Sequence, residues 1–140
     1  MPTIKRSRQR DAILNFLISR KDHPTAETVY THLRQTMPNI SLGTVYRNLS
    51  LLVELGQAIR VPSPDGLDHY DGCTDLHYHF ACRCCNSITD LDMPDLSLIN
   101  EIAAKSFSGT IEGHTTYFYG VCEKCTNIFK NDIDNQVTVC

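Results

Sequence analysis

The sequence predicts an α+β protein, with a winged helix-turn-helix domain at its amino-terminal end and a small α/β domain at its carboxy-terminal end. Two observations support this prediction. Three segments of helical periodicity precede a short hairpin pattern in the first half of the chain. Two Cys-x-x-Cys pairs then frame a second half in which β-forming segments surround one helical segment.

Two amphipathic helices are expected to open the chain. The first spans Arg8 to Ser19, where apolar residues recur at helical spacing. The second follows Pro24, which disfavours helix before it, and Thr25 can serve as its N-cap. Its inward face is predicted to hold four residues at positions i, i+3, i+4 and i+7: Ala26, Val29, Tyr30 and Leu33.

A third helix is expected to begin after Ser41 as N-cap and to end at Gly56, which can adopt a left-handed conformation. Its buried face would consist of Val45, Leu49, Leu52 and Val53. Its other face presents polar side chains able to contact DNA: Thr44, Tyr46, Arg47, Asn48 and Ser50. This order is typical of a helix-turn-helix, although small helical bundles share the periodicity.

A hairpin pattern after the third helix favours a winged domain over a plain bundle. Residues 58–62 and 67–70 have strand character, and residues 63–66 supply turn-forming Ser, Pro, Asp and Gly. A hairpin in this place is the wing of a winged helix. Residues 1–71 are therefore predicted to form a winged-helix DNA-binding domain and hinge.

Residues 72–140 are predicted to form an α/β dimerisation and metal-binding domain with a flexible tail. Strands are expected over residues 78–82, 87–92 and 115–121, and beyond Lys130 the sequence has no periodicity. A helix should start at Pro94 with four apolar residues facing inward: Leu98, Ile99, Ile102 and Ala103. Because this half has little apolar mass, a zinc site and dimerisation are plausible sources of stability.

Charge is divided unevenly along the chain. Residues 1–60 carry nine Lys and Arg against four Asp and Glu, a net +5, which leaves −8 for the other 80 residues of a chain with net charge −3. The basic half is expected to meet a polyanion and the acidic half to bind cations. The longest apolar run is too short to span a bilayer and no cleavable signal precedes it, so a cytoplasmic location without membrane contact is expected.

The cysteine pattern indicates a structural zinc site. An odd count of seven cysteines, two of them in each Cys-x-x-Cys pair, favours metal ligation over a disulfide framework. Four thiolates are the soft donors that Zn²⁺ takes in a closed tetrahedral site. The predicted ligands are Cys82, Cys85, Cys122 and Cys125.

A second group of donors lies just before the first cysteine pair. Asp71, His77 and His79 offer only oxygen and nitrogen, which suits Fe²⁺, Mn²⁺ or Zn²⁺ in a more exchangeable site. The sequence therefore predicts two chemically different metal sites close together. One metal would hold the fold and the other would be sensed.

Five motifs in order make the chain resemble the ferric uptake regulator superfamily, and within it the peroxide-sensing branch. They are His23-Pro-Thr-Ala-Glu-Thr-Val-Tyr30, Gly43-Thr-Val-Tyr-Arg-Asn-Leu49, Asp71 with His77-Tyr-His79, Cys82-x-x-Cys85 with Asp90, and Tyr119-Gly-Val-Cys122-x-x-Cys125. The resemblance implies a homodimeric repressor that binds a palindromic operator in double-stranded DNA. It also implies a regulatory site for Fe²⁺ or Mn²⁺ formed by His23, Asp71, His77, His79 and Asp90.

The peroxide-sensing branch implies a specific chemistry. Asp90 resembles that branch, since iron-responsive members typically have Glu at this position. Iron-catalysed oxidation of a ligand histidine, here His23 or His77, would release the protein from DNA. The alternatives are an iron-responsive repressor of the Fur type or a zinc- or manganese-responsive one.

Two other classes of protein fit the sequence less well. An enzyme, such as a small metal-dependent hydrolase, would need a nucleophile with a base or a phosphate loop, and neither pattern is present. A zinc-ribbon interaction module would leave the amino-terminal half and the donors His23, Asp71 and Asp90 without a role. We therefore expect a DNA-binding regulator and not an enzyme.

Overall fold

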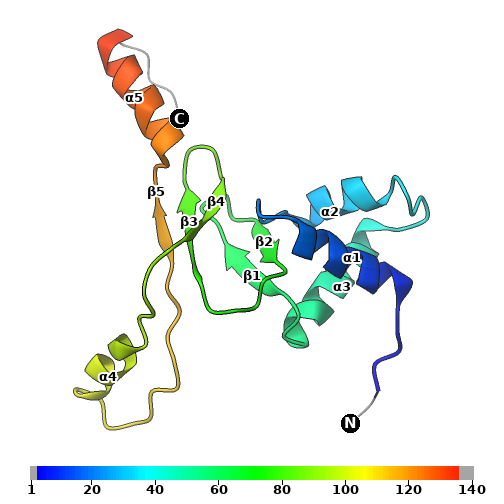
Figure 1. Cartoon of the computed structure of the whole chain (residues 1–140), viewed down its shortest axis with the longest axis horizontal. Coiled ribbons are helices and arrows are strands. Elements are labelled where there is room, and N and C mark those ends of the chain that lie inside the picture. Colours follow the sequence, from blue (N-terminus) through cyan, green and yellow to red (C-terminus); the bar gives the residue numbers. More distant parts are fainter. Residues whose placement is uncertain (1–2, 136–140) are drawn as a thin grey trace.

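The amino-terminal half is a helical domain of α1 (Arg8–Ser19), α2 (Ala26–Leu33) and α3 (Leu42–Glu54) in the computed structural model, which describes residues 3–135 (Figure 1). All three helices lie where the sequence predicts them. Their inward faces meet in one apolar core that α1 and α2 share with α3. The fully buried side chains of this core include Ile13, Leu17, Val29, Val45, Leu49, Leu52 and Tyr70.

Local sequence signals explain where these helices begin and end. The hydroxyl oxygens of Thr25 and Ser41 accept hydrogen bonds from backbone N–H groups in the first turns of α2 and α3. Ser7 caps α1 in the same way. Gly56 ends the third helix with φ of 71°, a left-handed conformation that favours glycine. The predicted caps at Thr25, Ser41 and Gly56 are thus confirmed.

The predicted wing is present as an antiparallel hairpin of β1 (Ile59–Pro62) and β2 (Asp68–Asp71). Its register pairs Ile59 with Asp71, so the hairpin ends at a predicted metal ligand, where the hinge begins. Val61 on the wing is buried in a small apolar cluster with Ala81 and Ile88 of the second sheet. The wing therefore belongs to the amino-terminal half and also packs against the carboxy-terminal half.

The second sheet has the strand order β4-β3-β5, formed by β3 (Tyr78–Cys82), β4 (Ile88–Leu91) and β5 (Phe118–Gly120). β3 pairs antiparallel with β4 and parallel with β5. The first two strands confirm the prediction. The third is shorter than the predicted residues 115–121, because only Phe80–Cys82 of β3 lie beside it. Together with the helical domain, this sheet confirms the predicted α+β class.

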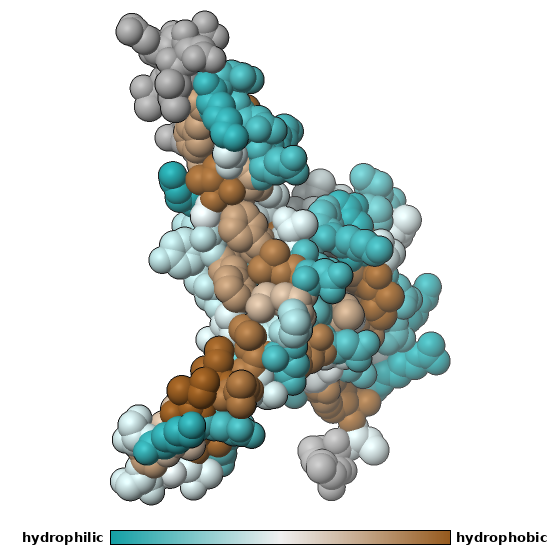
Figure 2. All heavy atoms as spheres, turned by 60° about the vertical axis from the view of Figure 1, so that its left-hand side comes forward, coloured by the Kyte–Doolittle hydropathy of each residue, from teal (hydrophilic) through white to brown (hydrophobic). Residues whose placement is uncertain are grey.

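The helix α4 (Leu98–Ala104) corrects one prediction. It starts later than Pro94, because Asp95 accepts hydrogen bonds from the Ser97 N–H and hydroxyl and holds a turn there. The predicted inward face was wrong: Leu98, Ile99 and Ile102 keep 62%, 42% and 58% of their surface exposed, and Ala103 is exposed too. The helix lies on an arm that projects away from the sheet, so nothing in the described chain covers it (Figures 1 and 2).

The helix α5 (Glu123–Asn135) was not predicted. Its signal in the sequence is short: Cys122, Cys125 and Phe129 fall at i, i+3 and i+7 and are the more buried positions at its start. Of the predicted flexible tail, residues 131–135 belong to this helix and residues 136–140 lie outside the described residues. A domain boundary near residue 71 stays a prediction. In the described part of the chain, no helix is long and apolar enough to cross a membrane.

The hinge after β2 passes very close to α1, which gives a testable prediction. A Cβ atom on Gly72 would lie 2.8 Å from the Ile18 backbone nitrogen and 2.9 Å from the Leu17 carbonyl carbon. We expect Gly72→Ala to lower the free energy of unfolding by about 1–3 kcal/mol, because backbone has to shift to admit the methyl group. Denaturant unfolding of the purified protein measures this change. Gly113→Ala is the control, since its Cβ would meet no atom within 4 Å; an equal loss in both variants would contradict the steric explanation.

Candidate metal centres

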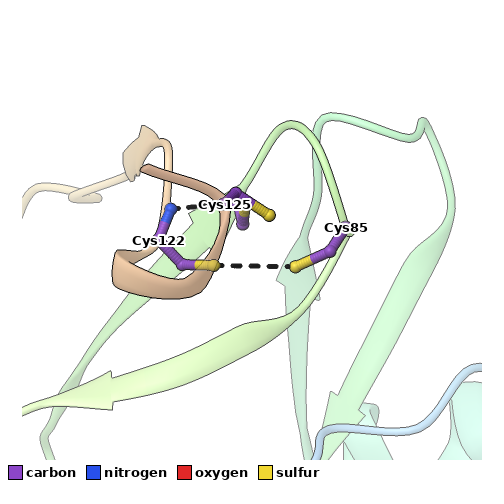
Figure 3. A group of neighbouring side chains, drawn as sticks. Cys85, Cys122 and Cys125 are labelled. Atoms are coloured by element: carbon purple, nitrogen blue, oxygen red, sulfur yellow. Dashed lines mark hydrogen bonds between the residues drawn. The ribbon is translucent and has the colours of Figure 1, made fainter. Parts of the chain in front are cut away.

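The four predicted zinc ligands come together at one end of the second sheet. Cys82 ends β3, Cys85 lies in the turn that follows it, and the second pair lies at the β5–α5 junction. The four sulfur atoms lie within 4.8 Å of one another and all four are free thiols. Figure 3 shows Cys85 and Cys122 pointing their sulfur atoms toward one another from the two turns, 3.8 Å apart.

Two of the four thiols at this end of the sheet have pKa values shifted in opposite directions when no cation is bound. Burial opposes ionisation of Cys82, but backbone N–H groups, among them those of Cys84 and Cys122 at 3.4 Å, outweigh it and lower the pKa of Cys82 to about 6. Burial and the neighbouring cysteine sulfurs raise the pKa of Cys125 to about 12. A divalent cation would stabilise the thiolate form of all four cysteines, because its charge offsets the repulsion between neighbouring thiolates. The residues therefore fit Zn²⁺.

The nitrogen and oxygen donors form a second cluster in which three imidazoles face two carboxylates. The Nε2 atoms of His77, His79 and His23 lie 2.7, 3.0 and 3.2 Å from Asp71 Oδ2. The same atoms of His23, His77 and His79 lie 3.0, 3.4 and 3.4 Å from Asp90 Oδ1. One ligand atom from each of the five residues falls within 4.8 Å of the others. The structure thus brings together all five predicted regulatory ligands.

The hydrogen bonds behind these ligands fit a metal ion. His23 Nδ1 donates to the Ile88 carbonyl at 3.2 Å, and His77 Nδ1 donates to the Asp75 carbonyl at 2.6 Å. A carbonyl can only accept, so the proton of each neutral ring is on Nδ1 and the lone pair of Nε2 points into the cluster. Histidine ligands in metal sites are commonly oriented in this way.

Contacts within this cluster shift the pKa values of Asp71, His23 and His77. Burial opposes ionisation of Asp71, but hydrogen bonds from His23 and His79 outweigh it and hold the pKa of that carboxyl far below its usual range. Burial likewise opposes the charged form of His23, but Asp71 and Asp90 outweigh it and raise the pKa of His23. His77 is shifted upward too: burial lowers its pKa, while the Asp75 carbonyl and Asp71 raise it by more. Both upward shifts favour the protonated form of His23 and His77, so a cation that enters the cluster has to compete with protons for these two rings.

The ligands come from both halves of the chain. His23 precedes α2 and Asp71 ends β2, so the winged domain positions these two. His77 precedes β3, whose His79 lies opposite Asp90 of β4 in the strand register. His23 is 2% exposed, whereas the side chain of Asp90 is 52% exposed. A cation bound here would join the two halves, and Asp90 would be its ligand nearest to solvent.

The predicted DNA-contacting face of α3 lies on the surface. Tyr46 and Arg47 are exposed, while Thr44 and Asn48 are half-buried. The Tyr46 hydroxyl donates to Glu27 Oε1 at 2.6 Å, which fixes the ring beside α2. Arg47 and Asn48 both donate to Thr44, at 3.1 and 3.0 Å. These four side chains form a hydrogen-bonded polar surface on α3, where contact with DNA is predicted.

The structure places a further histidine, His69, against the predicted regulatory cluster, although its sequence pattern predicts no role for it. It is 7% exposed, and its Nδ1 donates to the His23 carbonyl at 2.8 Å. The sequence holds a signal for the place of His69 beside Asp71, but none for its contact with His23. Because side chains alternate along a strand, His69 and Asp71 are expected on the same face of β2.

The chain combines a winged helix-turn-helix, a sheet domain and a five-donor cluster with ligands from both. This combination is typical of a metal-responsive transcription regulator. The chain belongs to the ferric uptake regulator family, whose family model matches residues 2–119. Among curated relatives, the peroxide-responsive repressor PerR of Staphylococcus saprophyticus is 36% identical over 117 residues, which cover 84% of this chain and 79% of the relative. The PerR of Staphylococcus aureus is 37% identical with the same coverage.

Solved structures support the same family. The peroxide stress regulator of Campylobacter jejuni superposes with a TM-score of 0.70 at 31% identity, covering 84% of this chain and 88% of that one. The ferric uptake regulator of Helicobacter pylori superposes with a TM-score of 0.76 over 88% of this chain and 83% of that one, at 22% identity. The second likeness concerns the fold alone.

Removal of one thiol ligand tests the zinc site. We expect Cys82→Ser to lose about one zinc per chain and to unfold or monomerise, because three thiolates no longer close the tetrahedral shell around the ion. Elemental analysis after dialysis and circular dichroism measure both effects. Cys73→Ser is the control, since Cys73 is a free, exposed cysteine outside the cluster. A soluble, folded Cys82→Ser protein with its full zinc content would rule out the assignment.

Proposed function

We propose that the protein is a metal-dependent repressor that releases its operator DNA when hydrogen peroxide oxidises a histidine of the regulatory site. The observation that carries this proposal is the five-donor cluster, which takes His23 and Asp71 from the winged domain and three ligands from the second sheet. The similarity to peroxide-responsive repressors supports the nature of the signal. The presence of Asp at position 90 agrees with that branch of the family.

Metal binding would act by selecting one arrangement of the two halves. The buried apolar cluster that the wing forms with the second sheet is small, consisting of Val61, Ala81 and Ile88 with Ile59 packed against them. A cation held by ligands from both sides therefore adds binding free energy to the closed arrangement alone. Loss of one ligand would weaken this selection and let the winged domain reorient.

The proposed repressor acts as a homodimer. The exposed apolar residues of α4, together with Phe107, cover part of an arm with no partner in the described chain (Figure 2). Tyr119 on β5 is also 67% exposed. Apolar residues that gather on one exposed arm are typical of a protein interface, and a second copy of the chain is the partner that the family implies. Two copies would present two α3 helices to the half-sites of a palindromic operator.

DNA recognition is assigned to the exposed edge of α3. Arg47 is the base-reading candidate, because its guanidinium can donate two hydrogen bonds to guanine in the major groove. Tyr46 offers a ring for contact with a thymine methyl group. The excess of Lys and Arg in residues 1–60 would supply contacts to phosphate.

The regulatory site would hold Fe²⁺ or Mn²⁺ through His23, Asp71, His77, His79 and Asp90. Iron supplies the ability to reduce hydrogen peroxide, which manganese in such a shell does poorly. A ligand imidazole, of His23 or His77, is then the nearest oxidisable group. Its ring carbon between the nitrogens gives up two electrons and gains one peroxide oxygen, while the other leaves as water. The product, 2-oxo-histidine, would be a poor ligand.

An alternative function is repression in response to metal availability alone. The same nitrogen and oxygen donors suit Fe²⁺, Mn²⁺ and Zn²⁺. A structure of a zinc-bound manganese uptake regulator superposes with a TM-score of 0.63 at 25% identity, covering 85% of this chain and 91% of that one. The alternative differs from the proposal in one respect: peroxide would leave operator binding unchanged.

A charge-matched pair of variants tests the DNA contact. We expect Arg47→Ala to weaken operator binding by about 1–3 kcal/mol, because a bidentate contact to a base is lost. Fluorescence anisotropy with operator and scrambled DNA at several salt concentrations measures the change. Arg83→Ala removes the same charge from an exposed position of the second sheet domain and should bind almost normally. Equal affinity of both variants would exclude Arg47 as a reader of sequence.

The peroxide switch is tested by loading the zinc-containing dimer with Fe²⁺ or Mn²⁺ and adding low hydrogen peroxide. The iron form should lose operator binding and gain one oxygen atom on His23 or His77, whereas the manganese form should keep both its binding and its mass. Peptide mass spectrometry locates the oxygen. Oxidised cysteines with unmodified histidines would indicate a thiol sensor instead. Retained DNA binding by the iron form would favour the metal-availability repressor.

A further inference from the structure

The regulatory ligand His23 has an unusual backbone conformation. Its φ is 54°, in the left-handed region that side-chain-bearing residues rarely adopt, and Pro24 follows it directly. The residue lies between the end of α1 and the start of α2, where this conformation turns its ring toward Ile88 and Asp90 of the second sheet. Some other part of the structure has to hold this conformation in place.

Strand β2 holds it through two hydrogen bonds. His69 Nδ1 donates to the His23 carbonyl at 2.8 Å, and the Tyr70 N–H donates to the Pro24 carbonyl at 3.0 Å. The chain also forms a bridge between Thr25 and His69. On its far side, His69 Nε2 lies 3.2 Å from Asp65 Oδ2 in the wing turn. The buried His69 ring is thus fixed at both nitrogens.

We propose that His69 is a positioning residue for the regulatory metal, holding the backbone of His23 so that the His23 ring reaches the ion. The inference rests on the proposed function in taking the five-donor cluster as a metal site. Strand β2 then has two roles at the metal site. It supplies Asp71 as a ligand, and its His69, two residues before Asp71, supports the ligand His23. The wing turn is joined to the metal ligand through Asp65, His69 and His23.

A merely structural His69 would satisfy a buried carbonyl and stabilise the fold, and nothing more. A positioning role predicts a different result: folded protein that binds the ion weakly. The position of the donor separates the two roles. Asparagine can place its amide nitrogen where His69 Nδ1 lies and still donate to the His23 carbonyl, whereas glutamine of similar bulk places its amide nearer to the former Nε2.

Mn²⁺ binding by the full-length, zinc-containing dimer tests the proposal. Electron paramagnetic resonance of free Mn²⁺ gives the affinity, and thermal unfolding of the manganese-free protein gives the stability. We expect His69→Gln and His69→Ala to bind Mn²⁺ about 10–100-fold more weakly than the wild type, while His69→Asn retains most of the affinity. His32→Ala is the control, because His32 is an exposed histidine stacked on Phe16 of the same domain.

Wild-type affinity in folded His69→Gln would overturn the inference, and so would equal weakening in the Asn and Gln variants. If His69→Ala fails to fold, the comparison of Asn with Gln decides alone. The proposed function fails in a separate way. Operator binding by the wild type that ignores Mn²⁺ would reject the repressor mechanism, while a weak His69→Gln site would still support His69 as the positioning residue.

Discussion

The arrangement of the molecule depends on the convergence of three imidazoles on one buried carboxylate. Asp71 Oδ2 lies within 3.2 Å of the Nε2 atoms of His23, His77 and His79, which belong to both halves of the chain. Such a cluster is stable only when its charges balance, either with protons on the rings or with one cation between them. The two solutions differ in geometry, because a cation gathers all five donors around one point whereas each proton serves a single pair.

Packing adds little to this electrostatic link between the halves. The winged domain has its own continuous core of a dozen buried apolar side chains, nine of which come from α1, α2 and α3. Between the wing and the second sheet, only Val61, Ala81 and Ile88 are buried together among the described residues. At about 25 cal/mol per Å² of buried apolar surface, these three side chains contribute less than a multidentate metal site can. In the proposed mechanism, an ion bound at the hinge would therefore contribute more than apolar packing to the free energy of the closed arrangement.

Features encoded by neighbouring residues could be predicted, and those encoded by distant contacts could not. The caps at Thr25 and Ser41 and the Cys-x-x-Cys pairs depend on spacings of a few residues, so the pattern suffices. The helix that carries Leu98 and Ile102 shows the limit, because periodicity reveals an apolar face without revealing what covers it. His69 shows it again: its contact with the His23 carbonyl joins residues 46 positions apart. Within the nitrogen and oxygen cluster, Asp71, His77 and His79 could be recognised from their spacing. His23 and Asp90 were named by resemblance, since nothing local links them to the other three.

The two clusters differ in where their ligands come from, and this difference assigns their roles. All four thiols belong to one unit, at the turns around β3 and β5, so a cation there holds a single domain together. The imidazoles and carboxylates belong to two units, so a cation there would link the units and favour one arrangement of them. A soft, closed four-sulfur shell exchanges its metal slowly, whereas a site with the half-exposed Asp90 at its edge can exchange with solvent. Of the two, the second cluster is therefore the one suited to the proposed sensing role, because it is reachable from solvent and includes ligands from the winged domain.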